Sequence, residues 1–274
     1  MTGRTPRAPR PAGWGVASAT TIGSFHVATH LPHQDSVRTW AAPDGSAAVV
    51  VVADGHGHHA HFRSDVGADL ATALTLDALT AALEGAGEVD PAAVAVDAVS
   101  AWRRAVLEHV AAHPLRSDEA RRGPLVPYGT TLVALAVSDD RLVALQVGDG
   151  DTVVVRASGR AWRPLPDDPD GDGVRTASLC QPDPMSSLRT ATVDLAADAA
   201  DQDDPVVLAM VCTDGFGKAR ADPDTWWSTT ARDLAATVRD GGLDALRARL
   251  PADVGDPAQV GGDDTSIAVV AATS

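Results

Sequence analysis

The sequence predicts an α+β fold, in which strands follow one another along the chain and helices come in pairs. Short apolar runs of strand length succeed one another between residues 128 and 156 and return between residues 188 and 213. Two helical patterns stand together before these strands, and two more stand together near the end of the chain. A doubly wound parallel sheet would instead alternate single strands with single helices.

The first two strands are expected at 14–20 and 47–53. The second of these runs reads AAVVVVA, which is apolar at every residue and rich in β-branched side chains. Such a run is typical of a strand that is buried on both faces. It ends abruptly at Asp54, which is followed by Gly55-His56-Gly57.

Two helices are expected next, because apolar residues recur at intervals of three or four in two consecutive stretches. Each helix would present one apolar face to a sheet. The second stretch follows Asp90-Pro91, a pair that suits the start of a helix. The two stripes consist of Val66, Leu70, Leu74, Leu76, Leu79 and Leu83, and of Val99, Trp102, Val106 and Val110.

The remaining strands and helices are predicted from the same apolar patterns and from the turns between them. Turn-forming residues separate the later strands, as at Ser138-Asp139-Asp140 and Gly148-Asp149-Gly150. The loop 164–187 is too polar for a core. With no repeat and no internal boundary, residues 14–274 are expected to form a single domain. Strands are expected at 130–137, 142–147, 152–156, 188–195, 206–213 and 266–271, and helices at 222–239 and 243–250.

The charge balance argues against several classes of function. A net charge of -15 and a pI near 4.8 disfavour binding to nucleic acid and to anionic membranes, and no basic stripe is visible. Arg4, Arg7 and Arg10 are interspersed with prolines, and no apolar segment of signal-peptide length accompanies them, so residues 1–13 are expected to be a disordered tail. No apolar run approaches the length of a membrane span, and a cytoplasmic location follows by elimination.

Aspartates recur in one setting, where an apolar strand ends and usually beside a glycine. A single aspartate there is ordinary turn chemistry. Several are more informative, because strand ends on one rim of a sheet converge and clustered carboxylates repel one another unless cations neutralise them. The five positions are Asp35, Asp54, Asp149, Asp214 and the pair Asp263-Asp264.

These residues predict a site for hard divalent cations. Carboxylate and carbonyl oxygens favour Mg²⁺ or Mn²⁺, whereas the lack of Cys/His ligand pairs in the sequence counts against zinc. Two such ions would bind a phosphate group and lower the pKa of a bridging water. Gly55 fits this interpretation, because only a residue without a side chain lets its carbonyl approach a metal closely.

The motifs, taken in order, resemble those of the type 2C metal-dependent serine/threonine protein phosphatases (the PPM family). The resemblance covers residues 14–271 and implies a four-layer αββα sandwich, in which two antiparallel sheets pack together and each is covered by a pair of helices. The motifs are Asp54-Gly55-His56-Gly57, Tyr128-Gly129-Thr130-Thr131, Gly148-Asp149-Gly150, Thr213-Asp214-Gly215 and Asp263-Asp264-Thr265-Ser266.

The resemblance also implies roles for the metal ligands. Asp54 would bridge two Mn²⁺ or Mg²⁺ ions, and Gly55 would offer its carbonyl to one of them. Asp214 and Asp263 would complete the binuclear shell. Asp35 stands where the family keeps an acidic residue that either binds metal directly or orients metal-bound water.

Two further roles are implied at the edges of this site. Asp149 matches a position that helps to hold a third, weaker metal in several members. His56 occupies a position at which the family is thought to protonate the leaving oxygen, a role that suits a histidine near its unperturbed pKa; the alternative is that His56 only shapes the turn. The segment from His30 to Asp35 looks like a bacterial branch in which His30 replaces a phosphate-binding arginine, so that substrate affinity would fall as pH rises.

The chain departs from the usual pattern at several positions. Gln34 replaces a carboxylate that many members use through water, and Lys218 stands where some members place another acid for the third metal. Asp264 replaces a usual asparagine, which leaves the choice of ligand between Asp263 and Asp264 open. The cluster His58, His59 and His61 is expected to be a solvent-facing helix start rather than a metal site.

Three alternatives compete with the phosphatase interpretation. Gly55-His-Gly57-His-His-Ala60 fits a dinucleotide fingerprint, but the region around Asp77, where a second strand should end, is helical in pattern. Gly215-Phe-Gly217-Lys218 lacks the spacing of a phosphate-binding loop. The serious alternative is a catalytically silent domain that binds a phosphoprotein or regulates a kinase; intact aspartates argue against it, while His30 and Gln34 leave it open.

The expected function is therefore metal-dependent hydrolysis of phosphoserine and phosphothreonine in proteins. The metals would activate a water for in-line attack on phosphorus, and no covalent phosphoenzyme is required. The expected partners are a phosphoprotein substrate and, from the biology of the family, a serine/threonine kinase. The chain is expected to act as a monomer, with no nucleic acid or membrane partner.

Overall fold

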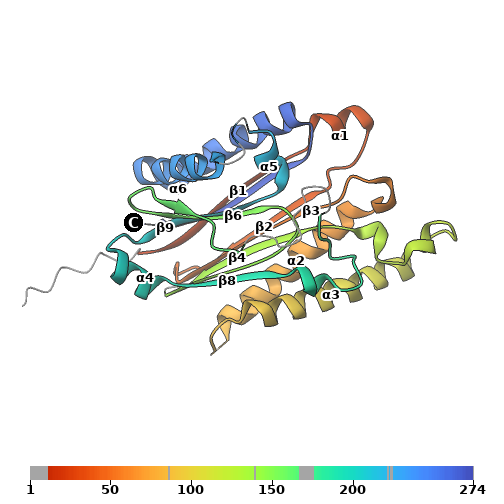
Figure 1. Cartoon of the computed structure of the whole chain (residues 1–274), viewed down its shortest axis with the longest axis horizontal. Helices are drawn as coiled ribbons and strands as arrows, with labels where there is room; N and C mark the ends of the chain where they lie inside the picture. The colour runs from red at the N-terminus through yellow and green to blue at the C-terminus, as the bar shows by residue number, and fades with distance from the viewer. Residues whose placement is uncertain are drawn as a thin grey trace, which may run out of the picture.

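Two antiparallel sheets, packed face to face and covered on their outer sides by helices, make up the fold (Figure 1). The computed structural model describes residues 12–85, 87–138, 140–166, 176–220, 222 and 225–273. The predicted four-layer αββα sandwich is thus confirmed. Most of the predicted tail and the middle of the polar loop 164–187 lie outside the described residues.

Each sheet contains five of the described strands, and every pairing between them is antiparallel. Sheet A has the order β1 (Gly13–Thr21), β10 (Thr265–Thr273), β9 (Val206–Cys212), β6 (Asp151–Arg156) and β7 (Ala161–Trp162). Sheet B has the order β2 (Asp35–Ala41), β3 (Ala47–Asp54), β4 (Leu132–Ser138), β5 (Arg141–Val147) and β8 (Arg189–Asp194).

Strand β3 shows how the apolar sequence builds this layered core. Alternate side chains of a strand point to opposite faces. Val50 and Val52 join the core between the two sheets, whereas Val49 and Val51 join the core beneath the helices. All four valines are fully buried, as the unbroken apolar run predicts.

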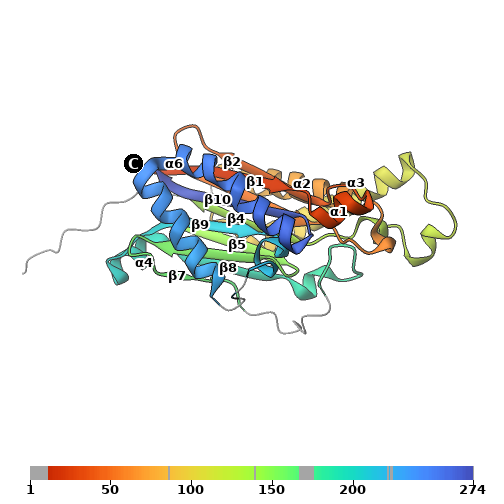
Figure 2. The ribbon, with the colours of Figure 1, turned by 90° about the horizontal axis from the view of Figure 1, so that it is seen from above.

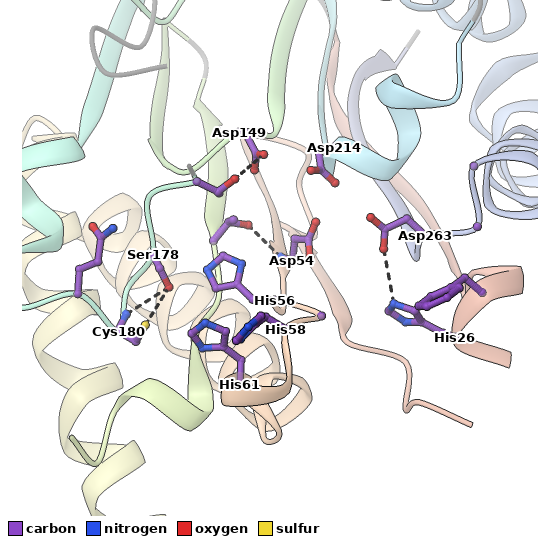
Figure 3. A pocket seen from close by; sticks show the side chains of 17 residues that line it. His26, Asp54, His56, His58, His61, Asp149, Ser178, Cys180, Asp214 and Asp263 are labelled. Carbon is purple, nitrogen blue, oxygen red and sulfur yellow. Dashed lines mark hydrogen bonds and ion pairs between the residues drawn. The ribbon is translucent and has the colours of Figure 1, made fainter. Parts of the chain in front are cut away.

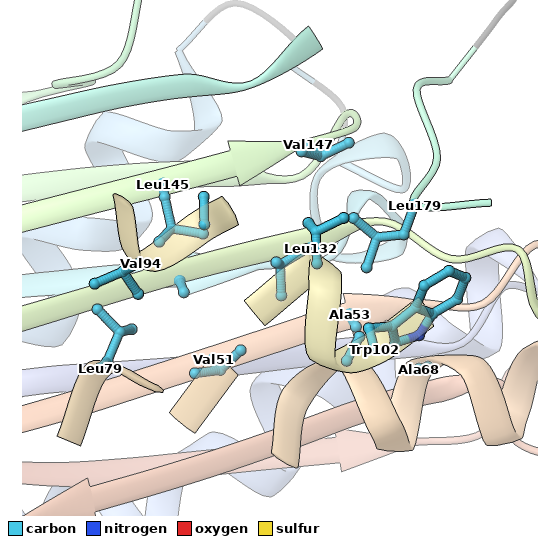
Figure 4. Packing of buried hydrophobic residues seen from close by; sticks show 14 of the residues in the cluster. Val51, Ala53, Ala68, Leu79, Val94, Trp102, Leu132, Leu145, Val147 and Leu179 are labelled. Atoms are coloured by element: carbon cyan, nitrogen blue, oxygen red, sulfur yellow. The ribbon is translucent and has the colours of Figure 1, made fainter. Parts of the chain in front are cut away.

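The outer face of sheet B is covered by α2 (Ser64–Glu84) and α3 (Pro91–Ala112) (Figure 4). The Trp102 indole of α3 is buried and donates a hydrogen bond of 2.9 Å to the carbonyl of Gly67 in α2. A Cβ atom on Gly67 would lie 2.1 Å from the carbonyl oxygen of Tyr128, so only glycine allows α2 to sit this close. By length and apolar composition alone α2 would pass for a membrane span; here it packs against sheet B and α3.

The outer face of sheet A is covered by α6 (Trp226–Gly261), which runs across the strands in the view from above (Figure 2). Gly242 interrupts this helix with φ 73° and ψ -173°. The break lies between the predicted helices 222–239 and 243–250, so α6 supplies the helix pair on this side. Helix α5 (Asp214–Lys218) follows β9 directly and packs against α6.

Several short elements were not predicted. Strand β2 carries half-exposed polar side chains, and the β-strand pattern is therefore weak in its sequence. Helix α1 (Ser24–Thr29) is a single turn and a half that exposes Phe25 and Val27. Helix α4 (Leu195–Gln202) begins where the predicted strand 188–195 should have ended, because Asp194 caps its first turn by accepting from the amides of Ala196 and Ala197.

Candidate metal-binding active site

The predicted aspartates lie at one end of the two sheets. Asp35 begins β2 and Asp54 ends β3, and the two residues face each other directly in the strand register. Asp214 opens α5 after β9, and Asp149 lies in the turn between β5 and β6. Asp263 lies in the turn that joins α6 to β10. The fold therefore brings to one rim residues that are up to 228 positions apart in the sequence.

These residues border a pocket of about 740 Å³ (Figure 3). Carboxylates lie along one side of it and histidines along another. Asp35 and Gly55 lie behind the lining rather than in it, and His30 is not among the lining residues. The predicted residues that do line the pocket are Asp54, His56, His58, His61, Asp149, Asp214 and Asp263.

Asp35 is buried, and only one of its two oxygens has a partner. Its Oδ2 accepts a hydrogen bond of 2.8 Å from the hydroxyl of Thr213, whereas its Oδ1 is buried without one. Burial raises the pKa of Asp35 well above its ordinary value, and the negative charges of Asp264 and Asp263 add to this effect. The hydroxyls of Ser266 and Thr213 oppose the rise.

Asp54 and Asp214 form the second part of the acidic cluster. Burial raises the pKa of Asp54 well above its usual value, and the charges of Asp35 and Asp214 raise it further. The carboxyl groups of Asp54 and Asp214 lie within hydrogen-bonding reach of each other. Like Asp35, Asp214 keeps one buried oxygen, Oδ1, without a partner.

The donor set fits a hard divalent cation. Within the described residues, no three His, Cys, Asp or Glu side chains stand close enough together to hold an ion as they are. A cation would nevertheless relieve two features of the site. These are the unpartnered oxygens of Asp35 and Asp214 and the mutual repulsion of the three carboxylates. Their oxygen chemistry suits Mg²⁺ or Mn²⁺.

The structure distinguishes Asp263 from its neighbour. Asp264 is almost fully buried, and its carboxylate accepts hydrogen bonds from two backbone amides, those of Gly23 at 2.8 Å and Gln34 at 2.6 Å. Both oxygens of Asp264 are therefore engaged in fixing the chain. Asp263 lines the pocket instead, with its side chain half exposed.

Gly55 lies at a point of close backbone approach. A Cβ atom there would stand 2.6 Å from the carbonyl oxygen of Gln34 and 2.7 Å from that of Ser64. The amide side chain of Gln34 donates to the hydroxyl of Ser64 at 2.5 Å and to the carbonyl of His56 at 3.4 Å. Gln34 thus fixes the loop after β3, in the place where the resemblance implies a carboxylate.

His56 lies against the pocket, with its ring 5.0 Å from that of His61 in an edge-on arrangement. Burial is the main cause that lowers the pKa of His56 to about 4; the neighbouring His61 contributes to the fall, and the charge of Asp149 opposes it. The ring is therefore uncharged at neutral pH, unlike the near-ordinary histidine that the resemblance implies. The Nδ1 of His61 lies 2.6 Å from the carbonyl oxygen of Val126 and must carry the proton, because a carbonyl only accepts.

His30 is exposed at the end of α1, where it adopts a left-handed backbone conformation with φ 57°. The pocket is lined by His26, one helical turn earlier. The Nε2 of His26 lies 3.7 Å from Asp263, and its Nδ1 lies 3.0 Å from Asp264. His26 was not predicted from the sequence, because α1 was not predicted. In this helix His26 lies one turn before His30.

Lys218 brings a positive charge to the acidic cluster. Its ammonium forms ion pairs with Asp214 and, at 3.4 Å, with Asp149. Although burial alone would lower the pKa of Lys218, the hydrogen bond and charge of Asp214 raise it above its ordinary value, and Asp149 adds to the rise. Asp149 also accepts a hydrogen bond of 2.8 Å from the hydroxyl of Thr176.

One wall of the pocket was not predicted from the sequence. The pocket is also lined by four residues of the polar loop 164–187, Thr176, Ser178, Cys180 and Gln181. The hydroxyl of Ser178 and the sulfur of Cys180 lie 3.2 Å apart. No motif in this loop marks it as part of a site. The amide of Leu179 and the hydroxyl of Ser178 both donate hydrogen bonds to the carbonyl of Thr130, in the predicted motif.

Comparisons with known proteins agree with the family resemblance seen in the sequence. A family model described as protein phosphatase 2C matches residues 22–251. PppA of Pseudomonas aeruginosa, described as a key regulatory component of T6SS, has a similar structure with a TM-score of 0.59 at 19% identity, covering 96% of this chain and 100% of that one. No curated protein matches the chain in sequence.

Two solved bacterial serine/threonine phosphatases are similar in the same way. PstP of Mycobacterium tuberculosis matches with a TM-score of 0.57 at 18% identity, covering 95% of this chain and 99% of that one. The enzyme of S. agalactiae matches with a TM-score of 0.58 at 17% identity, covering 94% and 99%. A structure of the PstP catalytic domain is a complex with two manganese ions.

Proposed function

The chain belongs to the protein phosphatase 2C family, and we propose on this basis that it hydrolyses phosphoserine and phosphothreonine in proteins with the help of two Mn²⁺ or Mg²⁺ ions. One observation carries the proposal. Asp54 and Asp214 line the pocket and Asp35 lies behind them, and one buried oxygen of Asp35 and one of Asp214 have no hydrogen-bond partner. Such a cluster is stable only when its carboxylates are protonated or bound to cations.

The residues that would hold the ions are Asp54, the carbonyl of Gly55, Asp214 and Asp263. Asp54 and Asp214 support this assignment because their carboxyl groups lie side by side at the pocket. Asp263 is supported over Asp264, whose oxygens are taken up by backbone amides. When bound, the ions would supply electrostatic stabilisation of the phosphoryl group and an activated water.

The protein's own groups would orient the substrate and the leaving group. His56 borders the pocket, and we assign to it a hydrogen bond to the departing serine or threonine oxygen. Asp35 lies behind Asp54 and is held by Thr213, so it would fix the position of Asp54 or of water at the site. His30, exposed outside the pocket lining, stays a prediction as the phosphate-binding residue.

The experiment is an assay of phosphothreonine peptide hydrolysis by protein stripped with chelator, with and without added Mn²⁺. Wild type is expected to recover turnover with Mn²⁺. Asp54→Asn should lower kcat at least ~100-fold even in Mn²⁺, since loss of outer-shell partners alone costs about 10–100-fold at metal sites. Asp240→Asn, an exposed residue of α6, removes the same charge and should behave as wild type.

Two results would contradict the proposal. Asp54→Asn with nearly full activity would show that this residue is not a ligand. A well-folded wild type that hydrolyses nothing with Mn²⁺ or Mg²⁺ would favour the silent, phosphoprotein-binding alternative.

A further inference from the structure

Lys218 occupies a place between two carboxylates of the pocket that come from separate parts of the fold. Asp214 opens α5, and Asp149 lies in the turn between β5 and β6 (Figure 3). The ammonium of Lys218 contacts Asp214 and lies 3.4 Å from the Oδ2 of Asp149. One positive charge therefore already bridges the two acids.

The fold fixes Lys218 in this position. Asp214 and Lys218 are four residues apart on α5, so their side chains lie on the same face of the helix. Between them, Phe216 is completely buried, and Gly217 lies against the Trp226 ring so closely that a Cβ atom would stand 2.5 Å from Cζ2. Helix α5 cannot rotate without breaking this packing, and the ammonium is thereby directed at Asp149.

The ammonium of Lys218 already supplies a positive charge between Asp149 and Asp214, so no further cation is needed there. Asp149 has two partners, the ammonium of Lys218 and the hydroxyl of Thr176, and both contact the same oxygen, Oδ2. A divalent ion held by Asp149 and Asp214 would stand next to the ammonium, and the two positive charges would repel each other strongly at such a short distance. The acids farther along the cluster, Asp35 and Asp54, have no cationic partner among the described ion pairs.

We infer that Lys218 takes the place of a third divalent cation, so that this chain binds two ions and uses its own ammonium to hold Asp149 and Asp214 together. This inference rests on the proposed two-metal function. Lys218 is a positioning residue: it acts through Asp214, one of the proposed ligands. The resemblance implies that Asp149 helps to hold a third metal. In this chain Asp149 instead forms an ion pair with Lys218.

The test counts bound Mn²⁺ by native mass spectrometry and by calorimetric titration of chelator-stripped protein. Wild type is expected to bind two ions. Lys218→Asp replaces the cation by a carboxylate next to Asp149 and Asp214, and should bind three. Lys218→Arg keeps the cation and should bind two. Adding Asp149→Asn to Lys218→Asp should return the count to two.

Each result bears on the inference separately from the enzymatic activity. Three ions on an active wild type, or two on Lys218→Asp, would overturn the role of Lys218 and leave the phosphatase proposal standing. No bound Mn²⁺ on wild type would overturn both. Because the Lys218 side chain is about two-thirds exposed, its variants should fold, and circular dichroism at saturating Mn²⁺ checks that they do.

Discussion

Asp35 and Asp54 face each other across β2 and β3, so without metal the end of this strand pair carries one buried and one half-buried carboxyl group. Burial raises the pKa of Asp35 above that of the unfolded chain, which is about 3.9. The folded protein therefore binds more protons than the unfolded chain does. Its stability should fall as pH rises from about 4 through the raised pKa.

The variant Asp35→Asn tests this dependence, because an amide is uncharged at every pH. In chelator, wild type should melt at a lower temperature at pH 8 than at pH 5, and Asp35→Asn should reduce that difference in melting temperature. Asp240→Asn changes the net charge equally and serves as the control. A wild type that gains stability between pH 5 and pH 8 in chelator would contradict the expectation.

At the level of single residues, the sequence predicted which aspartates come together but not their separate tasks. The strand-end setting correctly grouped Asp54, Asp149, Asp214 and Asp263 at one pocket. It did not separate Asp263 from Asp264, since adjacent residues share one setting and only the hydrogen bonds to backbone amides distinguish them. The position of the Lys218 ammonium between Asp149 and Asp214 could not be predicted either, because the turn and the helix that carry these residues meet only in the folded chain.

At the level of elements, the break in α6 depends on one backbone conformation. Gly242 has φ 73° and ψ -173°, a region open almost only to glycine. A Cβ atom there would meet nothing within 4 Å, so the cost of Gly242→Ala is conformational strain of about 1–3 kcal/mol. Urea unfolding should show this loss.

Gly255→Ala in the same helix is the matched control. Gly255 is helical and also has open space around its Cα, so alanine should raise the free energy of unfolding by about 0.4–1 kcal/mol. Equal effects of the two substitutions would contradict the assigned role of Gly242.

Elements with an uninterrupted or strongly periodic apolar pattern were predictable, and the others were not. Strand β3 is almost wholly buried, and α2 and α3 pack their apolar stripes against the core of sheet B, as their sequences indicate. Strand β2 stays half exposed, and the one-and-a-half-turn helix α1 exposes its phenylalanine and valine. Their positions depend on tertiary contacts, such as the hydrogen bonds from Gly23 and Gln34 to Asp264.

At the level of the whole molecule, the core between the sheets should dominate stability. Leu135 of β4 is fully buried there. Leu135→Ala is expected to lower the free energy of unfolding by about 2–5 kcal/mol, because it removes buried apolar volume and leaves a cavity. Leu107→Ala, at a 47% exposed position of α3, should change it by less than about 0.5 kcal/mol. Urea unfolding of the two variants measures both, and a small effect at Leu135 would contradict the layered core.

The arrangement of the strands in space was the least predictable feature. Periodicity indicated strands and paired helices, but the four layers followed from the family resemblance. Nothing local in the sequence states that β10 pairs with β1 on one side and with β9 on the other. Such pairings join residues more than 200 positions apart, for example Thr20 and Ser266, and arise only from global packing.

The central place of β10 in sheet A has a consequence for synthesis on the ribosome. Every strand of sheet B is translated before β9, so that sheet is available for pairing early. Strands β1 and β9 must wait for β10, which is made after all of them, and until then each offers an open edge to other nascent chains. Asp263 emerges only just ahead of β10. A nascent chain that stops short of Asp263 would therefore lack both one of the proposed metal ligands and the central strand of sheet A.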